Sequence, residues 1–206
     1  YDIDLFDTSA SLIAELQADG RKVICYFSAG SFEPWRSDAD AFPEAVKGRK
    51  MEGWDELWLD VSQIGLLAPV MEGRLDLAVV KGCDAVEPDN VDGYANGTGF
   101  DLSYDDQIAY NTFLAREAHE RGLSIALKND VEQVPDLVDV FDFAVNEECF
   151  SWNECGALEP FVEAGKAVLG VEYQLGTDAF CPQANAMDFD FMRKKLDLGV
   201  YREPCR

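Results

Sequence analysis

Residues 22–30 read Lys-Val-Ile-Cys-Tyr-Phe-Ser-Ala-Gly, a short apolar run that ends abruptly in small and polar residues. Such a run is typical of a buried β-strand that passes into a loop. Similar runs recur along the chain, separated by longer amphipathic stretches of helical period. The predicted strands are Asp2–Phe6, Lys22–Phe27, Leu57–Val61, Cys83–Glu87, Leu123–Lys128, Asp142–Asn146 and Ala167–Tyr173.

Two of the stretches between these strands carry clear helix signals. Leu12 and Leu16 are four residues apart and therefore share a helix face. Ser103 and Asp106 form a start that resembles a capping box, and Gly122 ends the same segment. We expect both segments to be crossover helices, which connect parallel strands.

This repeated alternation favours a closed barrel over an open doubly wound sheet. We therefore predict an α/β fold of the (β/α)8 TIM-barrel type, forming one domain over residues 1–206. An eight-fold barrel needs one strand more than the sequence offers, and it usually takes about 250 residues. The first strand is accordingly expected to be missing or truncated at the N-terminus.

The charge balance limits the possible partners. The chain has 17 Lys and Arg residues against 40 Asp and Glu residues, and its formal net charge is −23. This charge repels nucleic-acid phosphates and anionic lipid, and it favours cationic ligands. The chain shows neither a long apolar segment nor a basic region followed by an apolar one, so we expect no membrane span and no signal peptide in it.

The six cysteines point to disulfides, because no C-x-x-C pair is present and the chain has one histidine. An oxidising compartment follows, and we expect a secreted or extracellular protein. Cys149 and Cys155 are close enough in sequence to close one loop, whereas Cys25 lies in an apolar run and is a candidate buried free thiol. The full connectivity stays open.

Carboxylates collect at the ends of the predicted strands. In a β/α barrel these ends and the loops after them meet at one mouth. One protonated carboxyl group that donates to a leaving oxygen, with one ionised carboxylate that attacks or activates water, performs glycoside hydrolysis. Crowded carboxylates raise one another's pKa, which keeps one of them protonated near neutral pH.

Two other interpretations of this acidic rim stay open. Carboxylates at loop starts also arise by chance in so acidic a chain, and they serve as helix N-caps. Clusters of Asp and Asn can instead hold a divalent cation.

Several segments at these strand ends resemble glycoside hydrolase family 114, the endo-α-1,4-polygalactosaminidases. They span nearly the whole chain in the family's order, although the aromatic-rich first strand that is usual in the family is absent. The segments are Tyr26–Glu33 with Trp35 and Arg36, Trp58–Asp60, Glu87–Tyr94, Leu127–Asp130, Asn146–Cys149 and Val171–Tyr173.

The resemblance implies a barrel hydrolase that cuts inside α-1,4-linked galactosamine or N-acetylgalactosamine polymers. It implies that Asp89, in Glu-Pro-Asp-Asn, and Glu147, in Asn-Glu-x-Cys, are the catalytic pair. Which of the two is the acid is left open. Strand alternation allows a second interpretation. Phe143, Val145 and Glu147 share one face of the strand, and if this face packs against the helices, Glu148 points inward and takes the place of Glu147.

The remaining candidates fit a sugar site, in which aromatic rings stack on sugar faces, Lys128 steadies the carboxylates and polar groups accept from hydroxyl or amine groups. The aromatic residues have an alternative role in the core. The predicted substrate-binding residues are Tyr26, Ser28, Glu33, Asp60, Glu87, Asn90, Asp92, Tyr94, Lys128, Asn129, Glu148, Glu172 and Tyr173.

We expect no cofactor and no metal, and a monomer whose partner is a cationic or N-acetylated galactosamine polysaccharide. Two alternatives remain for the function. One is a carbohydrate-binding barrel without activity, and the other is an endo-glycosidase of different sugar specificity, because this fold hosts many sugar chemistries.

Overall fold

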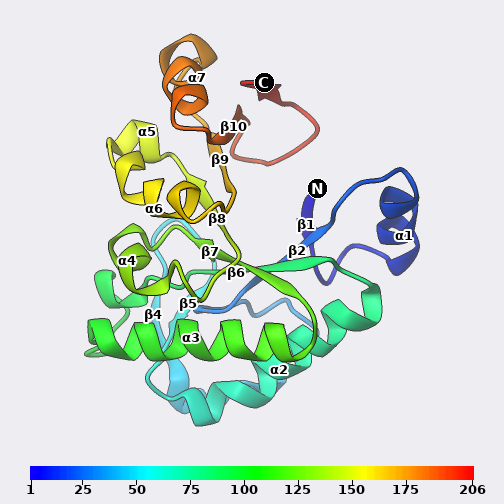
Figure 1. The fold of residues 1–206 in the computed structure, drawn as a ribbon. Helices are drawn as coiled ribbons and strands as arrows, with labels where there is room; N and C mark the ends of the chain where they lie inside the picture. The colour runs from blue at the N-terminus through cyan, green and yellow to red at the C-terminus, as the bar shows by residue number, and fades with distance from the viewer. The chain divides into compact units, whose positions relative to one another are not determined.

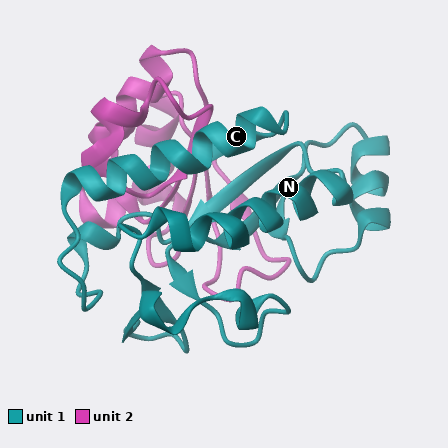
Figure 2. Ribbon diagram, turned by 90° about the horizontal axis from the view of Figure 1, so that it is seen from below, with its two compact units in different colours: residues 1–126 teal, residues 127–206 magenta.

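Strands and helices alternate along most of the chain, which the computed structural model describes from residue 1 to residue 206 (Figure 1). The chain divides into two compact units, residues 1–126 and residues 127–206 (Figure 2). The elements of the first unit are β1 (Asp2–Asp4), α1 (Ala10–Ala18), β2 (Ile24–Ser28), β3 (Ser31–Phe32), β4 (Lys47–Lys50), β5 (Leu57–Leu59), α2 (Ile64–Lys81), β6 (Ala85–Asp89), α3 (Tyr104–Glu120) and the start of β7 (Ser124–Lys128), with 3-10 turns at Ala39–Ala41, Glu44–Val46 and Gly93–Ala95.

The second unit begins within β7 and continues the alternation with shorter helices. The end of β7 and the strands β8 and β9 carry predicted site residues. The elements are α4 (Val134–Leu137), β8 (Phe143–Glu147), α5 (Cys149–Trp152), α6 (Glu159–Glu163), β9 (Val168–Glu172), α7 (Thr177–Ala186), β10 (Asp190–Arg193) and β11 (Glu203–Pro204), with 3-10 turns at Val131–Gln133 and Cys155–Leu158.

Parallel strands form the main sheet of the first unit. β1, β2, β6 and the start of β7 pair in this order, each parallel to the next. The register of β2 and β6 sets Tyr26 beside Glu87 and Ser28 beside Asp89. Predicted site residues therefore lie level with one another at the carboxyl ends of adjacent strands.

The prediction that Leu57–Val61 belongs to the parallel sheet is wrong. The structure places β5 in a separate three-stranded antiparallel sheet, between β3 and β4. Its apolar residues fit either sheet equally well, and its partner β4 is the charged run Lys-Gly-Arg-Lys, which carries no strand pattern of its own.

In the second unit, β8, β9 and β10 are parallel, and the short β11 lies antiparallel to β10. β10 follows α7 after a turn at residues 187–189 and is not among the predicted strands. Its Phe191 is buried, and the ring of Phe191 fills the space beside Gly170 that a Cβ atom would otherwise take. The backbone N–H of Asn129, just after β7, donates to the carbonyl of Val145 in β8 over 2.9 Å.

Both predicted helices are present, and α3 has the expected ends. Ser103 and Asp106 form a complete capping box at the start of α3, and Gly122 follows this helix with a φ of 74°. In α1 the buried residue is Ile13, whereas Leu12 is exposed. None of the helices combines the length and apolar character that crossing a bilayer requires.

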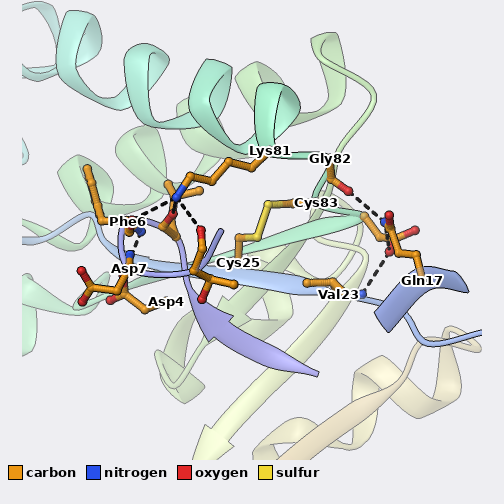
Figure 3. The surroundings of a disulfide bond; sticks show 12 residues. Asp4, Phe6, Asp7, Gln17, Val23, Cys25, Lys81, Gly82 and Cys83 are labelled. Carbon is orange, nitrogen blue, oxygen red and sulfur yellow. Dashed lines mark hydrogen bonds between the residues drawn. A yellow bond between two sulfur atoms is a disulfide. The ribbon is translucent and has the colours of Figure 1, made fainter. Parts of the chain in front are cut away.

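All six cysteines form disulfides, Cys25 with Cys83, Cys149 with Cys155, and Cys181 with Cys205. The candidate free thiol at Cys25 is therefore wrong: Cys25 lies on β2 and Cys83 lies just before β6, its parallel neighbour. Figure 3 shows this disulfide beside Lys81, whose ammonium group donates to three backbone carbonyls of the loop after β1.

Candidate active site

The predicted site residues divide into two groups, one in each unit. The first group lies at and after β2, β5 and β6, and the second lies at and after β7, β8 and β9. The first group is Tyr26, Ser28, Glu33, Asp60, Glu87, Asp89, Asn90, Asp92 and Tyr94, and the second is Lys128, Asn129, Glu147, Glu148, Glu172 and Tyr173.

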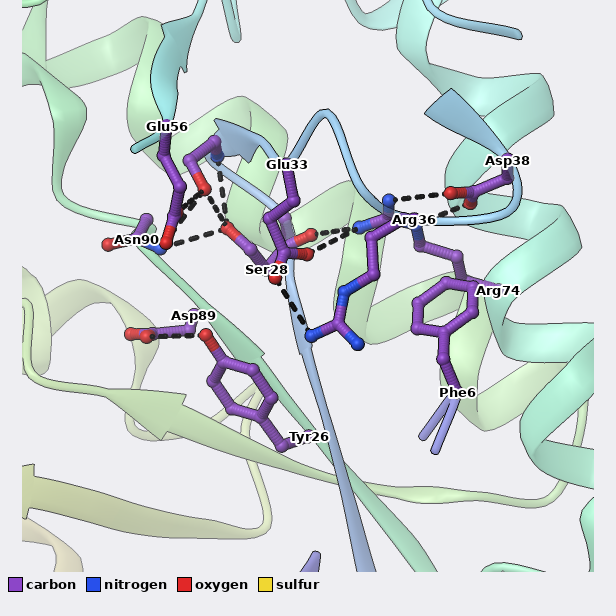
Figure 4. Close-up of polar contacts among 12 residues, drawn as sticks. Phe6, Tyr26, Ser28, Glu33, Arg36, Asp38, Glu56, Arg74, Asp89 and Asn90 are labelled. Carbon is purple, nitrogen blue, oxygen red and sulfur yellow. Dashed lines mark hydrogen bonds and ion pairs between the residues drawn. The ribbon is translucent and has the colours of Figure 1, made fainter. Parts of the chain in front are cut away.

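Asp89 ends β6 and is partly exposed. The hydroxyl of Tyr26, on the neighbouring β2, donates to Asp89 Oδ2 over 3.3 Å (Figure 4). The backbone N–H groups of Ala29 and Gly30 both donate to the Asp89 carbonyl, over 2.8 and 3.0 Å. Main chain and side chain of Asp89 are thus both bonded to the β2 segment, which limits the positions its carboxylate can take.

Asn90 makes a sharp corner directly after Asp89. Its φ is 61°, in the left-handed region that Asn tolerates better than most residues. Its side-chain amide donates to Ser28 Oγ over 2.8 Å. Gly30 passes so close that an added Cβ would lie 1.6 Å from the Asn90 carbonyl oxygen, and this contact explains why a glycine is needed there.

Glu33 lies in a buried ion-pair cluster. Its carboxylate accepts from Arg36 over 2.8 Å and lies 3.9 Å from Arg74. Arg74 also pairs with Asp38 and donates to the Ser28 carbonyl (Figure 4). Burial acts to lower the pKa of Arg36, but its hydrogen bonds to Glu33 and Asp4 outweigh burial and raise that pKa. Only 2% of Glu33 is exposed, so the structure gives it a role in this cluster.

The other residues of the first group lie in different settings. Glu87 is buried within β6, and Asp92 immediately precedes the 3-10 turn Gly93–Ala95. Asp60 follows β5 outside the parallel sheet and accepts hydrogen bonds from the backbone and hydroxyl of Ser62. Tyr94 packs edge-on against the ring of Tyr104, with centroids 5.5 Å apart.

Glu147 ends β8 and is the centre of the second group. Its Oε1 accepts from the Tyr173 hydroxyl over 2.5 Å, and Lys128 Nζ lies 3.9 Å from the same oxygen. Its backbone N–H donates to Asn129 Oδ1 over 2.9 Å. One third of the Glu147 side chain is exposed, whereas Lys128 and Tyr173 are buried. The carboxylate is therefore held from one side and open on the other.

The burial pattern of β8 shows which face Glu147 occupies. Ala144 and Asn146 are buried, whereas Phe143, Val145 and Glu147 on the other face are half-buried. Glu148 lies beyond the strand end with a φ of 65°, and its N–H donates to the Val171 carbonyl. Burial raises the pKa of Glu148, and the nearby carboxylates of Glu172 and Glu147 raise it further.

Glu172 lies on the opposite face of its strand from Val171, which pairs with Glu147. It is fully buried, and its carboxylate accepts from the Phe150 N–H over 2.9 Å and from the Ser151 hydroxyl over 2.6 Å. These bonds fix the first turn of α5, so the structure gives Glu172 an anchoring role.

Tyr173 is a neutral donor to Glu147. Burial raises the pKa of its hydroxyl, and the Glu147 charge raises it further. A phenol with a raised pKa keeps its proton and continues to donate to the carboxylate.

Each unit has a surface hollow. One, of about 410 Å³ in the second unit, is lined by Val131, Glu132, Asn153, Glu154, Gly156 and Ala157. The other, of about 390 Å³ in the first unit, is lined by Phe6, Asp7, Trp35, Arg36, Ser37, Leu77 and Lys81. Neither is lined by Asp89 or Glu147. No group of three or more metal-binding side chains is gathered in a way that could hold an ion.

Alternating strands and helices, with a carboxylate held at the carboxyl end of β6 and another at the end of β8, define a β/α-barrel protein of the glycoside-hydrolase class. Comparison with known families makes this specific. The chain belongs to glycoside-hydrolase family GH114, whose model matches residues 1–206. The predicted family and enzyme class are confirmed.

One solved structure of high identity agrees with this assignment, and two of low identity share the fold. Ega3 of Aspergillus fumigatus, solved in complex with galactosamine, is 42% identical to this chain with a TM-score of 0.95, and the match covers 100% of this chain and 87% of that chain. The glycoside hydrolase domain of PelA from Pseudomonas aeruginosa is 14% identical with a TM-score of 0.73, covering 98% and 89%. Amy13B of Eubacterium rectale is 11% identical with a TM-score of 0.57, covering 89% and 50%.

The last two likenesses concern the fold alone. Together with the Ega3 match they confirm the predicted α/β fold of the (β/α)8 barrel class. A comparison with curated proteins finds no match.

Proposed function

We propose that this hydrolase cuts within polymers of α-1,4-linked galactosamine or N-acetylgalactosamine, with Asp89 and Glu147 as its catalytic carboxyl groups. Membership of GH114 and the 42% identity to Ega3, which was solved with galactosamine, support this substrate class. Both carboxyl groups end parallel strands, and in a β/α barrel these ends carry the chemistry. This position of the two carboxyl groups carries the proposal.

In hydrolysis by such a pair, the two carboxyl groups have different tasks. One carboxyl group protonates the oxygen that leaves, and the other, ionised, attacks the anomeric carbon or activates a water molecule. The Tyr26 hydroxyl orients Asp89, and Tyr173 with Lys128 orients Glu147. Each carboxyl group is thereby limited to a narrow range of positions, which proximity catalysis requires.

The charge of the protein suits a cationic substrate. A galactosamine polymer without acetyl groups carries ammonium groups near neutral pH, and a protein with a net charge of −23 attracts it. Encounter with the polymer is therefore faster than for a neutral protein of the same shape.

Three disulfides support an oxidising setting, and we propose a secreted protein that acts as a monomer on extracellular polysaccharide. No observation favours a carbohydrate-binding barrel without activity.

Product analysis tests the proposal. The purified protein is incubated with galactosaminan of high and of low acetylation, and the products are separated by size. We expect short oligosaccharides to be released early from the interior of the chains. Monosaccharide as the sole early product would contradict endo action, and no cleavage of either polymer would contradict the substrate class.

A further inference from the structure

Glu56 is a buried carboxyl group that neither the sequence motifs nor the proposed pair explains. It lies just before β5 and is 7% exposed. It forms no ion pair, and its carboxylate accepts a hydrogen bond from the Ser31 hydroxyl. A buried carboxyl group without a paired cation is costly to keep, so its hydrogen-bond partners indicate its role.

A continuous chain of hydrogen bonds leads from Glu56 to Asn90 (Figure 4). The Ser31 hydroxyl lies 2.5 Å from the Ser28 hydroxyl, and both serines are fully buried. Ser28 Oγ also accepts from the Ser31 N–H over 3.1 Å and from the Asn90 side-chain amide over 2.8 Å.

The direction of this chain follows from the number of available protons. An ionised Glu56 can only accept, so the Ser31 hydroxyl donates its single proton to Glu56 and must accept from Ser28. Ser28 then accepts from the amide of Asn90, which turns the Asn90 Oδ1 away from the serines. The ionised carboxylate is thus the terminal acceptor that orients every donor before it.

Asn90 is the residue that turns the chain after Asp89. Its left-handed backbone lies against Gly30, and the Asp89 carbonyl accepts from the N–H groups of Ala29 and Gly30. A rotation of the Asn90 side chain away from Ser28 would loosen this corner and shift the end of β6.

The surroundings of Glu56 raise its pKa above that of an ordinary glutamate. Burial raises the pKa of Glu56, and the carboxylates of Glu33 and Asp89 raise it further, whereas the Ser31 hydrogen bond and the charge of Arg36 act to lower it. A protonated Glu56 could itself donate to the Ser31 oxygen. The hydrogen bonds from Asn90 to Glu56 would then no longer have to run in one direction.

We propose that Glu56 is a positioning residue for Asp89, acting through Ser31, Ser28 and Asn90 as the terminal acceptor of this buried hydrogen-bond chain. The inference rests on the proposed function insofar as Asp89 is the carboxyl group that acts on substrate.

Kinetics of three variants test the proposal on galactosaminan. Glu56→Ala removes the acceptor, and we expect kcat to fall about tenfold with KM within twofold, because the substrate contacts remain. Glu56→Gln can still accept from Ser31, and we expect it to recover most of kcat. Its activity should no longer follow the titration of Glu56, so part of the acid limb of the pH profile should disappear. Ser31→Ala breaks the chain by removing the donor to Glu56 while the Glu56 side chain stays in place, and we expect the same loss of kcat from it, which decides the question if Glu56→Ala fails to fold.

The exposed Glu52→Gln is the matched control and should leave kcat, KM and the pH profile unchanged. Wild-type kcat in both Glu56→Ala and Ser31→Ala would overturn the proposal.

A second measurement does not depend on activity. In NMR spectra of the whole chain, the Asn90 side-chain NH2 signals should shift with pH in the wild type, and the part of this shift that is due to Glu56 should be missing in Glu56→Gln. The same pH dependence of these signals in both proteins would overturn the proposal even if the enzyme is active. An inactive wild type would instead contradict the proposed function, and the NMR result would still decide the role of Glu56.

Discussion

The side chain of Glu147 shows how neighbours decide what a carboxyl group can do. Its Oε1 is bonded to the buried Tyr173 and lies near Lys128, while one third of the side chain stays exposed. Glu172, also acidic and also at a strand end, is fully buried and bonded to α5. Glu147 and Glu172 thus differ because Glu172 faces α5 and anchors it, whereas Glu147 faces away from that helix.

Tyr173→Phe tests whether the hydroxyl positions Glu147. Phe keeps the ring and hence any stacking on sugar, but it loses a hydrogen bond to a charged group, which contributes about 1.5–3 kcal/mol. We expect kcat to fall at least tenfold and KM to stay within twofold. Tyr201→Phe, in the C-terminal segment, is the control. An unchanged kcat in Tyr173→Phe would show that the ring alone matters.

Glu148→Gln tests the electrostatic cost of crowded carboxylates. The pKa of Glu148 is raised above 4.5 in the folded state, so the folded state binds its proton more tightly than the unfolded state does. Its stabilising contribution is present below pH 4.5 and is lost as the pH rises through the folded pKa.

We therefore expect Glu148→Gln to have a larger free energy of unfolding than the wild type at pH 7, and no such advantage at pH 4. Urea unfolding at both pH values measures this, with exposed Glu163→Gln as control. A Glu148→Gln protein that is less stable than the wild type at pH 7 would refute the account.

At this scale the sequence predicts which residues lie at the strand ends, because parallel strands bring their carboxyl ends to the same edge. It does not predict what each side chain binds. Glu33 pairs with Arg36 and also lies 3.9 Å from Arg74, which comes from α2, and Glu56 carries no motif at all. Such roles depend on contacts between distant segments.

Elements are predicted well where their signals are local. The capping box of α3 and the apolar runs of β2, β6, β7, β8 and β9 are visible in sequence, and the structure has them. β10 is missed because it has only four residues and is separated from α7 by only residues 187–189. The sheet that holds β5 is missed because pairing with β4 depends on tertiary contacts and not on the pattern of either strand.

The stabilising effects of two of the disulfides can be measured separately. In the chain-entropy account, the Cys25–Cys83 bond, with a sequence separation of 58, stabilises by about 4 kcal/mol, and the Cys149–Cys155 bond, with a separation of 6, by about 2 kcal/mol. Replacing each pair by Ala should lower the free energy of unfolding in this order. Because Cys149–Cys155 closes the loop that contains α5, its loss should also reduce kcat.

Urea unfolding and activity assays of both double variants measure these effects. A larger loss of stability from the Cys149–Cys155 pair than from the Cys25–Cys83 pair would contradict the entropic account.

Across the whole molecule, the net charge of −23 is the dominant long-range property. Attraction to a cationic polymer is screened by salt, with a Debye length of about 10 Å at 0.1 M. We expect KM on galactosaminan without acetyl groups to rise when the NaCl concentration increases from about 20 to about 300 mM, whereas kcat stays constant. The fully acetylated polymer is the control, since it carries no charge. Equal salt dependence for both polymers would contradict electrostatic steering.

The central claim is that Asp89 and Glu147 together break the glycosidic bond. The most direct measurement is the rate of oligosaccharide release from galactosaminan by Asp89→Asn and Glu147→Gln, with polymer binding measured in parallel. Each variant should lose activity by at least about a hundredfold while it still binds polymer. Release of oligosaccharides at the wild-type rate by either variant would contradict the claim.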